Sequence, residues 1–111
     1  MPTPTNSDQL HGTIDMLVLK VLEDGPLHGY AIAVRLERMS NDVLSVEEGS
    51  LYPALHRMEE SGWIKARWKT TENKRRARVY EITPAGRRRL DEDEQRWRTV
   101  AGAVALVLKK A

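Results

Sequence analysis

Residues 47–63 read EEGSLYPALHRMEESGW, and this stretch decides the fold. Leu51, Leu55 and Met58 recur at the spacing of a single helical face, while polar side chains occupy the positions between them. Gly62 follows at the position where a glycine commonly ends a helix. The pattern therefore predicts a helix that packs one face against a core and offers the other face to a partner.

The start of this helix depends on Pro53, which lacks a backbone N–H. If Ser50 is the N-cap, Pro53 is the third helical residue, and no intrahelical hydrogen bond is lost there. If the helix begins nearer Glu47, its first turn must be irregular. The sequence is compatible with both starts.

Upstream of this stretch, the sequence predicts two further helices and a short strand. Residues 10–23 carry an apolar helical stripe, which Met16 and Leu19 widen beyond one face. A helix that is apolar on two sides needs a second helix to cover it, for instance one from a partner subunit. Residues 29–40 are the next predicted helix, and residues 43–46 are the predicted strand.

Downstream of Trp63, the spacing of the apolar residues changes from that of a helix to every second residue. Apolar and basic residues alternate over residues 64–69, which is typical of a half-buried strand. Residues 70–77 form a polar turn, in which Asn73 is expected to adopt the left-handed conformation, and residues 78–82 form the return strand. The tip of this predicted β-hairpin carries Lys74, Arg75 and Arg76.

Charge is concentrated in this hairpin. Residues 65–78 have a net charge of +6, which leaves −4 for the remainder of a chain whose total is +2. A basic patch on an otherwise mildly acidic protein indicates a polyanionic partner that touches one surface. The alternative is a charged hairpin that is simply solvated.

A final helix is predicted from Pro84 to about residue 109, with Thr83 as its N-cap. Leu90, Trp97 and Val104 repeat every seven residues, and the apolar residues between them complete a heptad-like seam. About 25 residues of helix exceed what so small a core can cover. The seam therefore predicts a dimer interface.

The order of the predicted elements is that of a winged helix-turn-helix, a mainly α fold of the α+β type. In this fold the third helix enters the major groove of DNA, and the hairpin, or wing, touches the flanking backbone or minor groove. The chain is expected to divide into a disordered tail (1–9), the DNA-binding domain (10–83) and a C-terminal dimerisation helix (84–111).

Four polar residues of the third helix have expected roles in DNA binding. Arg57 is suited to a bidentate contact with guanine, and His56 to a base edge. Ser50 and Tyr52 are suited to phosphate contacts. The structural alternative is that Tyr52 packs its ring on the second helix and Pro53 only shapes the helix start.

Four motifs resemble those of the PadR family of bacterial transcriptional regulators, in particular its short members with a single C-terminal helix. They are LVLKVL (17–22), HGY (28–30), GSLYPALHRMEESGWI (49–64) and NKRRARVYEITPAGRRRL (73–90). The resemblance covers nearly the whole chain from Leu10 onward. It implies a dimeric winged-helix repressor whose last helix packs on the first helix of the partner subunit.

The resemblance also assigns residues. Some short family members bind flat aromatic compounds at the dimer centre with a tryptophan of the last helix, and Trp97 is similarly placed, although ordinary interface packing would explain it as well. By the resemblance, Tyr30, Ser50, Tyr52 and Pro53 fall in or beside the DNA-reading surface, and Lys74, Arg75 and Arg76 fall on the wing tip. Together with His56, Arg57 and Lys69, which the residue pattern suggests, they are the candidate DNA contacts. The candidate interface residues are Ile14, Leu17, Leu90, Trp97, Val100, Val104 and Val107.

Other function classes have weaker support in the sequence. The 111 residues include no Cys, and His11, His28 and His56 lack ligand spacing, so neither a metal nor another cofactor is expected. Glycine-rich phosphate loops and HExxH motifs, which would indicate an enzyme, do not occur. No signal peptide or membrane span is predicted, so we expect a cytoplasmic protein.

The expected partners are therefore a second copy of the chain, a double-stranded, pseudo-palindromic DNA operator and a small-molecule effector, and no membrane partner is expected. The main alternative is a winged-helix module that binds another protein without specific DNA binding. The basic wing argues against that alternative, because the cores of protein interfaces are depleted of charge.

Overall fold

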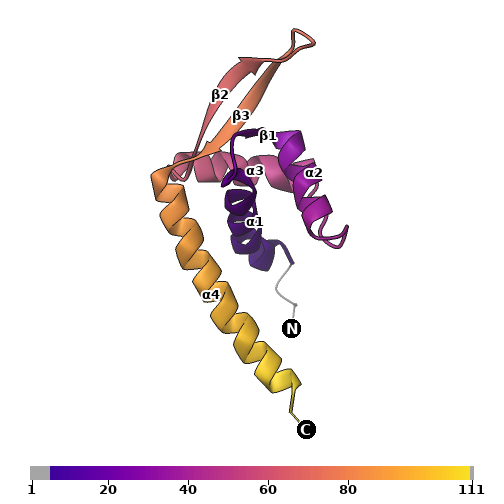
Figure 1. Ribbon diagram of the computed structural model, residues 1–111, viewed down its shortest axis with the longest axis vertical. Helices are drawn as coiled ribbons and strands as arrows, with labels where there is room; N and C mark the ends of the chain where they lie inside the picture. Colours follow the sequence, from indigo (N-terminus) through magenta and orange to yellow (C-terminus); the bar gives the residue numbers. More distant parts are fainter. Residues whose placement is uncertain (1–5, 111) are drawn as a thin grey trace.

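The computed structural model describes the backbone of residues 6–110 and the side chains of residues 13–110. Its elements are α1 (Asn6–Leu22), β1 (Leu27–His28), α2 (Gly29–Met39), α3 (Glu48–Glu60), β2 (Ile64–Thr70), β3 (Arg76–Ile82) and α4 (Pro84–Leu108). Helices α1 to α3 pack together, the β2–β3 hairpin projects from them, and α4 runs along α1 and beyond it (Figure 1). The predicted winged helix-turn-helix, mainly α with a small antiparallel sheet and a long C-terminal helix, is confirmed.

The core lies between the three packed helices, the base of the sheet and the first part of α4. Met16 and Leu19 widen the apolar stripe of α1 as expected, and both are buried. The second side of α1 is covered within the chain, because α4 packs on it and buries Leu90 completely. An ion pair of 3.2 Å between Lys20 and Glu94 joins the two helices at the surface. A partner subunit is therefore not needed to bury these two residues of α1.

The Lys20–Glu94 pair also shifts the pKa values of its members. Hydrogen bonds to the carboxylates of Glu23 and Glu94 raise the pKa of Lys20. The hydrogen bond from Lys20 lowers the pKa of Glu94. Each charge therefore favours the ionised form of the other.

The N-terminal boundary of the fold differs from the expected one. Helix α1 begins at Asn6 rather than at Leu10, so residues 6–9 of the expected disordered tail are helical. Residues 1–5 of that tail lie outside the described residues. The C-terminal helix ends at Leu108, one residue before the expected end.

The expected strand at residues 43–46 is wrong. This segment follows Asn41 and Asp42, which both have positive φ, and the Ser40 hydroxyl accepts a hydrogen bond of 2.9 Å from the Leu44 N–H. These local turns satisfy the backbone without a sheet. The free edge of β3 instead pairs with β1, in the register Leu27↔Tyr80, which sequence reasoning did not anticipate.

Helix α3 takes the earlier of its two possible starts. Glu47 is the N-cap, and its carbonyl accepts hydrogen bonds from the N–H groups of both Ser50 (3.0 Å) and Leu51 (2.9 Å). The first turn is thus partly of the tighter 3₁₀ type. Pro53 lies inside the helix, so the carbonyl of Gly49 receives no N–H four residues on.

The β2–β3 hairpin has two faces that differ in composition, and the register runs from Ile64↔Ile82 to Thr70↔Arg76. The inner face packs on the core at its base, and it comprises Ile64, Ala66, Trp68, Thr70, Arg76, Arg78, Tyr80 and Ile82. The outer face comprises Lys65, Arg67, Lys69, Ala77, Val79 and Glu81. In the turn, Lys74 rather than Asn73 has positive φ (59°), because the Thr71 carbonyl accepts from the Lys74 N–H and closes the turn there.

Helix α4 begins where predicted, after the N-cap Thr83 and with Pro84 in its first turn. The Thr83 hydroxyl accepts a hydrogen bond of 3.0 Å from the Gly86 N–H and donates one of 2.6 Å to the Gly62 carbonyl. A Cβ atom at Gly86 would overlap the carbonyl oxygen of Trp63. This contact fixes where α4 leaves the body of the domain.

Candidate nucleic-acid interface

Helix α3 separates its buried and exposed residues as the sequence predicted. Leu51, Leu55 and Met58 have at most 1% of their surface exposed and hold the helix to the core. The exposed residues include four of the candidate DNA contacts, Ser50, Tyr52, Pro53 and His56. The structure thus brings these four together on the solvent face of a rigidly packed helix.

Arg57 differs from these residues because its side chain turns toward α1. Its guanidinium donates a hydrogen bond of 2.9 Å to a carboxylate oxygen of Asp15, which is 8% exposed. His56 remains exposed and forms an ion pair of 2.9 Å with Glu60 when the imidazole is protonated. Arg57 would have to leave Asp15, or share its donors, before it could contact a base.

The ring of Tyr52 packs against Gly29 of α2. A Cβ atom at Gly29 would lie 2.9 Å from Cε1 of the Tyr52 ring, which is tighter than side chains normally pack. Tyr52 is still 43% exposed, so packing and contact with a partner are both available to it. Tyr30, the neighbour of Gly29 in the HGY motif, is 70% exposed. The glycine of this motif therefore makes room for an aromatic residue of α3.

The candidate contacts of the hairpin are all exposed. In the part of the chain that the structure describes, no carboxylate lies within ion-pair distance of Lys69, Lys74 or Arg75. On the outer face, Lys65 and Arg67 share Glu81 at 3.2 and 3.5 Å. The charge that remains uncompensated is therefore concentrated toward the tip of the hairpin.

Sequence reasoning missed a cluster where the inner face of the hairpin meets α3. Arg76 and Arg78 both lie against the ring of Trp68, with guanidinium carbons 5.1 and 5.6 Å from its centroid. Arg78 also forms an ion pair of 2.9 Å with Glu59 of α3. The period-two pattern already placed Trp68 and Arg78 on one face of the hairpin and could have indicated the cluster.

Tyr80 lies beside this cluster and is almost fully buried. Burial raises the pKa of its hydroxyl, and Arg78 opposes the shift in part. Tyr80 therefore stays neutral at physiological pH and belongs to the packing between hairpin and helix rather than to the charged surface.

The candidate dimer interface divides into two groups. Leu90 and Ile14 are 0% and 6% exposed, so they belong to the core of the single chain, and little of either side chain is left for a partner to contact. Leu17 is half-buried against that core. The second group lies on the outer part of α4 and is at least 50% exposed, namely Trp97, Val100, Val104 and Val107. These four residues form an uncovered apolar stripe.

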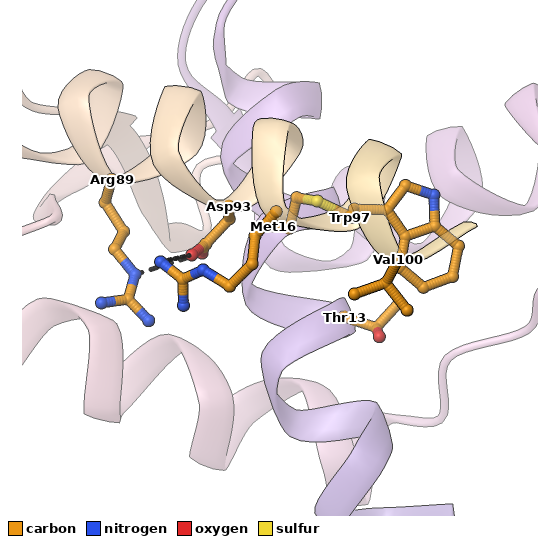
Figure 2. A pocket seen from close by; sticks show the side chains of 7 residues that line it. Thr13, Met16, Arg89, Asp93, Trp97 and Val100 are labelled. Atoms are coloured by element: carbon orange, nitrogen blue, oxygen red, sulfur yellow. Dashed lines mark hydrogen bonds and ion pairs between the residues drawn. The ribbon is translucent and has the colours of Figure 1, made fainter. Parts of the chain in front are cut away.

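A cavity of about 250 Å³ lies between α1 and α4, next to this stripe. Figure 2 shows Trp97 and Val100 of α4 near Thr13 and Met16 of α1 at its apolar end. At the other end, Arg89 donates a hydrogen bond of 3.1 Å to Asp93. The cavity is smaller than most ligand pockets, which are about 300–1,000 Å³.

Two further features of the described residues bear on function. Among the described residues, no three His, Asp or Glu side chains are grouped closely enough to hold a metal ion. No helix in the same part of the chain is both long and apolar enough to cross a membrane.

Comparison with known proteins identifies the family. The sequence profile of the transcriptional regulator PadR-like family matches residues 18–92. The chain belongs to this family. PadR-like proteins are transcriptional regulators rather than enzymes, and membership supports a DNA-binding regulator.

Two individual proteins are similar in sequence to this chain. A transcriptional regulator of Mycobacterium tuberculosis is 36% identical over 70% of this chain and 69% of its own length. An uncharacterised 37.1 kDa transposon protein of Streptomyces fradiae is 42% identical over 80% of this chain. The present chain corresponds to only 24% of that longer protein.

Solved structures superpose on nearly the whole chain. A transcriptional regulator from Clostridium thermocellum superposes with a TM-score of 0.83 at 27% identity, over 92% of this chain and 99% of its own. A PadR-like transcriptional regulator from Bacillus cereus gives 0.78 at 27% identity, over 94% and 99%. The single long helix after the hairpin is therefore shared with regulators of similar length.

Proposed function

We propose that the chain is a sequence-specific DNA-binding repressor that acts as a homodimer and releases DNA when an effector binds. One observation carries the DNA-binding part of this proposal. The exposed polar face of α3 adjoins a hairpin whose tip cations, Lys74 and Arg75, have no carboxylate partner within the described residues. A duplex could receive α3 in its major groove while the hairpin follows the backbone.

The proposed contacts have different tasks. His56 and Arg57 would read base edges, with Arg57 exchanging Asp15 for a guanine. Tyr30, Ser50, Tyr52 and Pro53 would position α3 on the backbone. Lys69, Lys74, Arg75 and Arg76 would neutralise phosphates in any sequence.

The apolar stripe on the outer part of α4 supports the homodimer. Four large apolar side chains at helical spacing, each at least 50% exposed, would be costly to leave in water. In a two-fold dimer, the two α3 helices would meet successive major grooves about 34 Å apart on a pseudo-palindromic operator. Bound there, the dimer would block the access of RNA polymerase.

A pair of substitutions tests the dimer. Val104 lies on the stripe, whereas Leu106, which is 73% exposed, lies on the opposite side of α4. We expect Val104→Glu to yield monomers in analytical ultracentrifugation and Leu106→Glu to leave the dimer intact. Identical sedimentation of both variants and the unchanged protein would remove α4 as the interface.

The cavity between α1 and α4 is where an effector would bind. It is small in one chain, and a second protomer packed on Trp97 and Val100 would cover its apolar end. A ligand there would change the angle between the long helices and hence the spacing of the two α3 helices. Ordinary packing of Trp97 at the interface remains the competing explanation.

Fluorescence anisotropy tests the main proposal directly. The purified protein is titrated against DNA from upstream of its own gene and against a scrambled duplex of equal length, over a series of salt concentrations. We expect tight binding to the upstream duplex alone, weakening steeply with salt. No binding to either duplex at low salt would favour the protein-interaction module instead.

A further inference from the structure

Trp68 occupies an unusual position for a large aromatic residue. It lies on the inner face of the hairpin, beyond the point where that face packs on the core, and 56% of its surface is exposed. An exposed indole gains nothing for the fold from the core. Two arginines of the neighbouring strand lie against its ring, which indicates a role in holding charge.

The register of the hairpin explains how the arginines reach the ring. Arg78 is directly opposite Trp68 on the neighbouring strand, and Arg76 is its diagonal neighbour on the same face. Both guanidinium carbons lie within about 6 Å of the ring centroid, the range in which a cation is attracted to the face of an aromatic ring. The ring therefore restrains two long side chains that would otherwise sample many rotamers.

Glu59 of α3 completes the arrangement. Its carboxylate accepts a hydrogen bond of 2.9 Å from Arg78, and the Glu59 side chain is 29% exposed. Since Arg78 sits on the hairpin and Glu59 on the helix, the pair spans the angle between the two elements. That angle is where one strand of a duplex would pass if α3 occupied a groove and the hairpin the next one.

We propose that Trp68, Arg76 and Arg78 form a phosphate-binding platform for the DNA backbone between α3 and the hairpin, and that Glu59 occupies Arg78 until a phosphate displaces it. This inference rests on the proposed DNA binding and adds a site to it. Trp68 is a positioning residue, because it acts through the two guanidinium groups. Glu59 acts as an internal competitor that keeps Arg78 neutralised in the absence of DNA.

The chemistry of the platform fits a phosphodiester. A guanidinium presents paired N–H donors that match two oxygens of either a carboxylate or a phosphate, so the same donors of Arg78 can pass from Glu59 to DNA. Arg76 has no carboxylate partner within the described residues, and it would add a second donor group beside the first. Stacking on Trp68 would hold the guanidinium groups of Arg76 and Arg78 in place and lower the entropic cost of the contact with a phosphate.

The outer face of the same hairpin supplies matched controls. Arg67 also forms an ion pair with a glutamate, Glu81, but points away from α3 and has no aromatic neighbour among the contacts of the described residues. Arg67→Ala is the control for Arg78→Ala, and Glu81→Gln is the control for Glu59→Gln. Within each pair, the two substitutions remove the same charge at a similar distance from the core. General electrostatic effects predict equal results within each pair.

The test measures binding of each variant to upstream and scrambled duplexes by anisotropy over a salt series. Arg78→Ala should lower the salt slope of binding by about 1 per protomer, and Arg67→Ala should change it much less. Glu59→Gln should bind both duplexes more tightly than the unchanged protein, and Glu81→Gln should not exceed it. Equal effects within the pairs would overturn the platform.

Trp68 is tested by truncation and by rescue. Trp68→Ala should weaken binding to both duplexes about fivefold, and Trp68→Phe should restore most of the loss, with unchanged thermal unfolding midpoints. Binding of Trp68→Ala at the strength of the unchanged protein would refute the positioning role while leaving the proposed function intact. If the unchanged protein binds neither duplex, the proposed function fails, and the platform fails with it.

Discussion

Helix α3 and the tip of the hairpin both carry cations, but they hold them in different ways. On α3, Arg57 is paired with Asp15 and His56 with Glu60. At the tip, Lys74 and Arg75 have no carboxylate partner in the described part of the chain. The Arg57 pair also links α3 to α1, whereas the cations of the tip contribute charge alone.

This difference predicts that α3 and the hairpin tip have different roles in DNA binding. A side chain on a helix that is packed against the core can discriminate between bases, because the helix holds its backbone in a defined position. A solvated side chain on a turn neutralises a phosphate in any sequence, and its contribution falls with salt. Substitutions in α3 should therefore alter stability or specificity, and those at the tip should alter affinity alone.

The largest expected effect comes from the buried side of α3. Leu55→Ala should lower the free energy of unfolding by about 3 kcal/mol, because it leaves a cavity at a side chain that is fully buried. Arg75→Ala should change it by less than about 0.5 kcal/mol. Chemical denaturation followed by circular dichroism measures both, and comparable losses would mean that the hairpin tip is part of the folded core's cooperative unit.

Arg57 should have the next largest effect, on specificity. Arg57→Ala should reduce the preference for the upstream duplex over the scrambled one by about 1–3 kcal/mol, since a guanine contact is lost. Asp15→Asn removes the same ion pair but keeps the guanidinium, so it should retain the preference. If the two variants lose preference equally, Arg57 serves only to hold α3 to α1.

The hairpin tip should show the opposite behaviour. Lys74→Ala combined with Arg75→Ala should weaken binding to both duplexes alike. Raising the salt concentration from 50 to 200 mM weakens DNA binding by a certain factor in the unchanged protein. In the double variant this factor should be about tenfold smaller per protomer, because two phosphate contacts are missing. Arg87→Ala with Arg88→Ala, on exposed positions of α4, removes the same charge elsewhere and serves as the control. A change in specificity would assign base contacts to the tip.

The sequence predicted the elements whose patterns are local. Helix α3, the hairpin and the Thr83 cap were evident because apolar spacing and capping residues act within a few positions. The prediction of a strand at residues 43–46 was wrong. A strand forms only where another strand offers a free edge, and the free edge of β3 pairs with Leu27–His28 instead. Pairing of distant segments has no local signature.

The candidate site was predicted by residue type rather than by orientation. Exposure of the hairpin cations followed from their position in a turn. The Arg57–Asp15 pair joins residues 42 positions apart, and the Glu59–Arg78 pair joins residues 19 apart, so neither could be read from spacing. Leu90 fitted the heptad seam, yet it is buried in the chain's own core because α4 crosses α1 at that level.

A small effect on stability is also expected at Gly29, where α2 meets α3. Gly29→Ala should push the Tyr52 ring outward, because the new Cβ would lie 2.9 Å from Cε1 of that ring. The ring is the far end of a flexible side chain, so it can move at little cost, and alanine itself favours the helix. Unfolding should therefore change by less than about 1 kcal/mol, whereas DNA affinity should fall severalfold if Tyr52 contacts the backbone.

The double variant with Tyr52→Phe separates the two roles of Tyr52. If its hydroxyl binds a phosphate, Tyr52→Phe alone should lower DNA affinity, and adding Gly29→Ala should cost little more, because the contact is already lost. If the ring serves only as packing, Tyr52→Phe should bind as the unchanged protein does. Additive losses of DNA affinity would mean that Tyr52 and Gly29 act through independent contacts. The packing of the Tyr52 ring on Gly29 would then position α3 without affecting the contact that the Tyr52 hydroxyl makes with DNA.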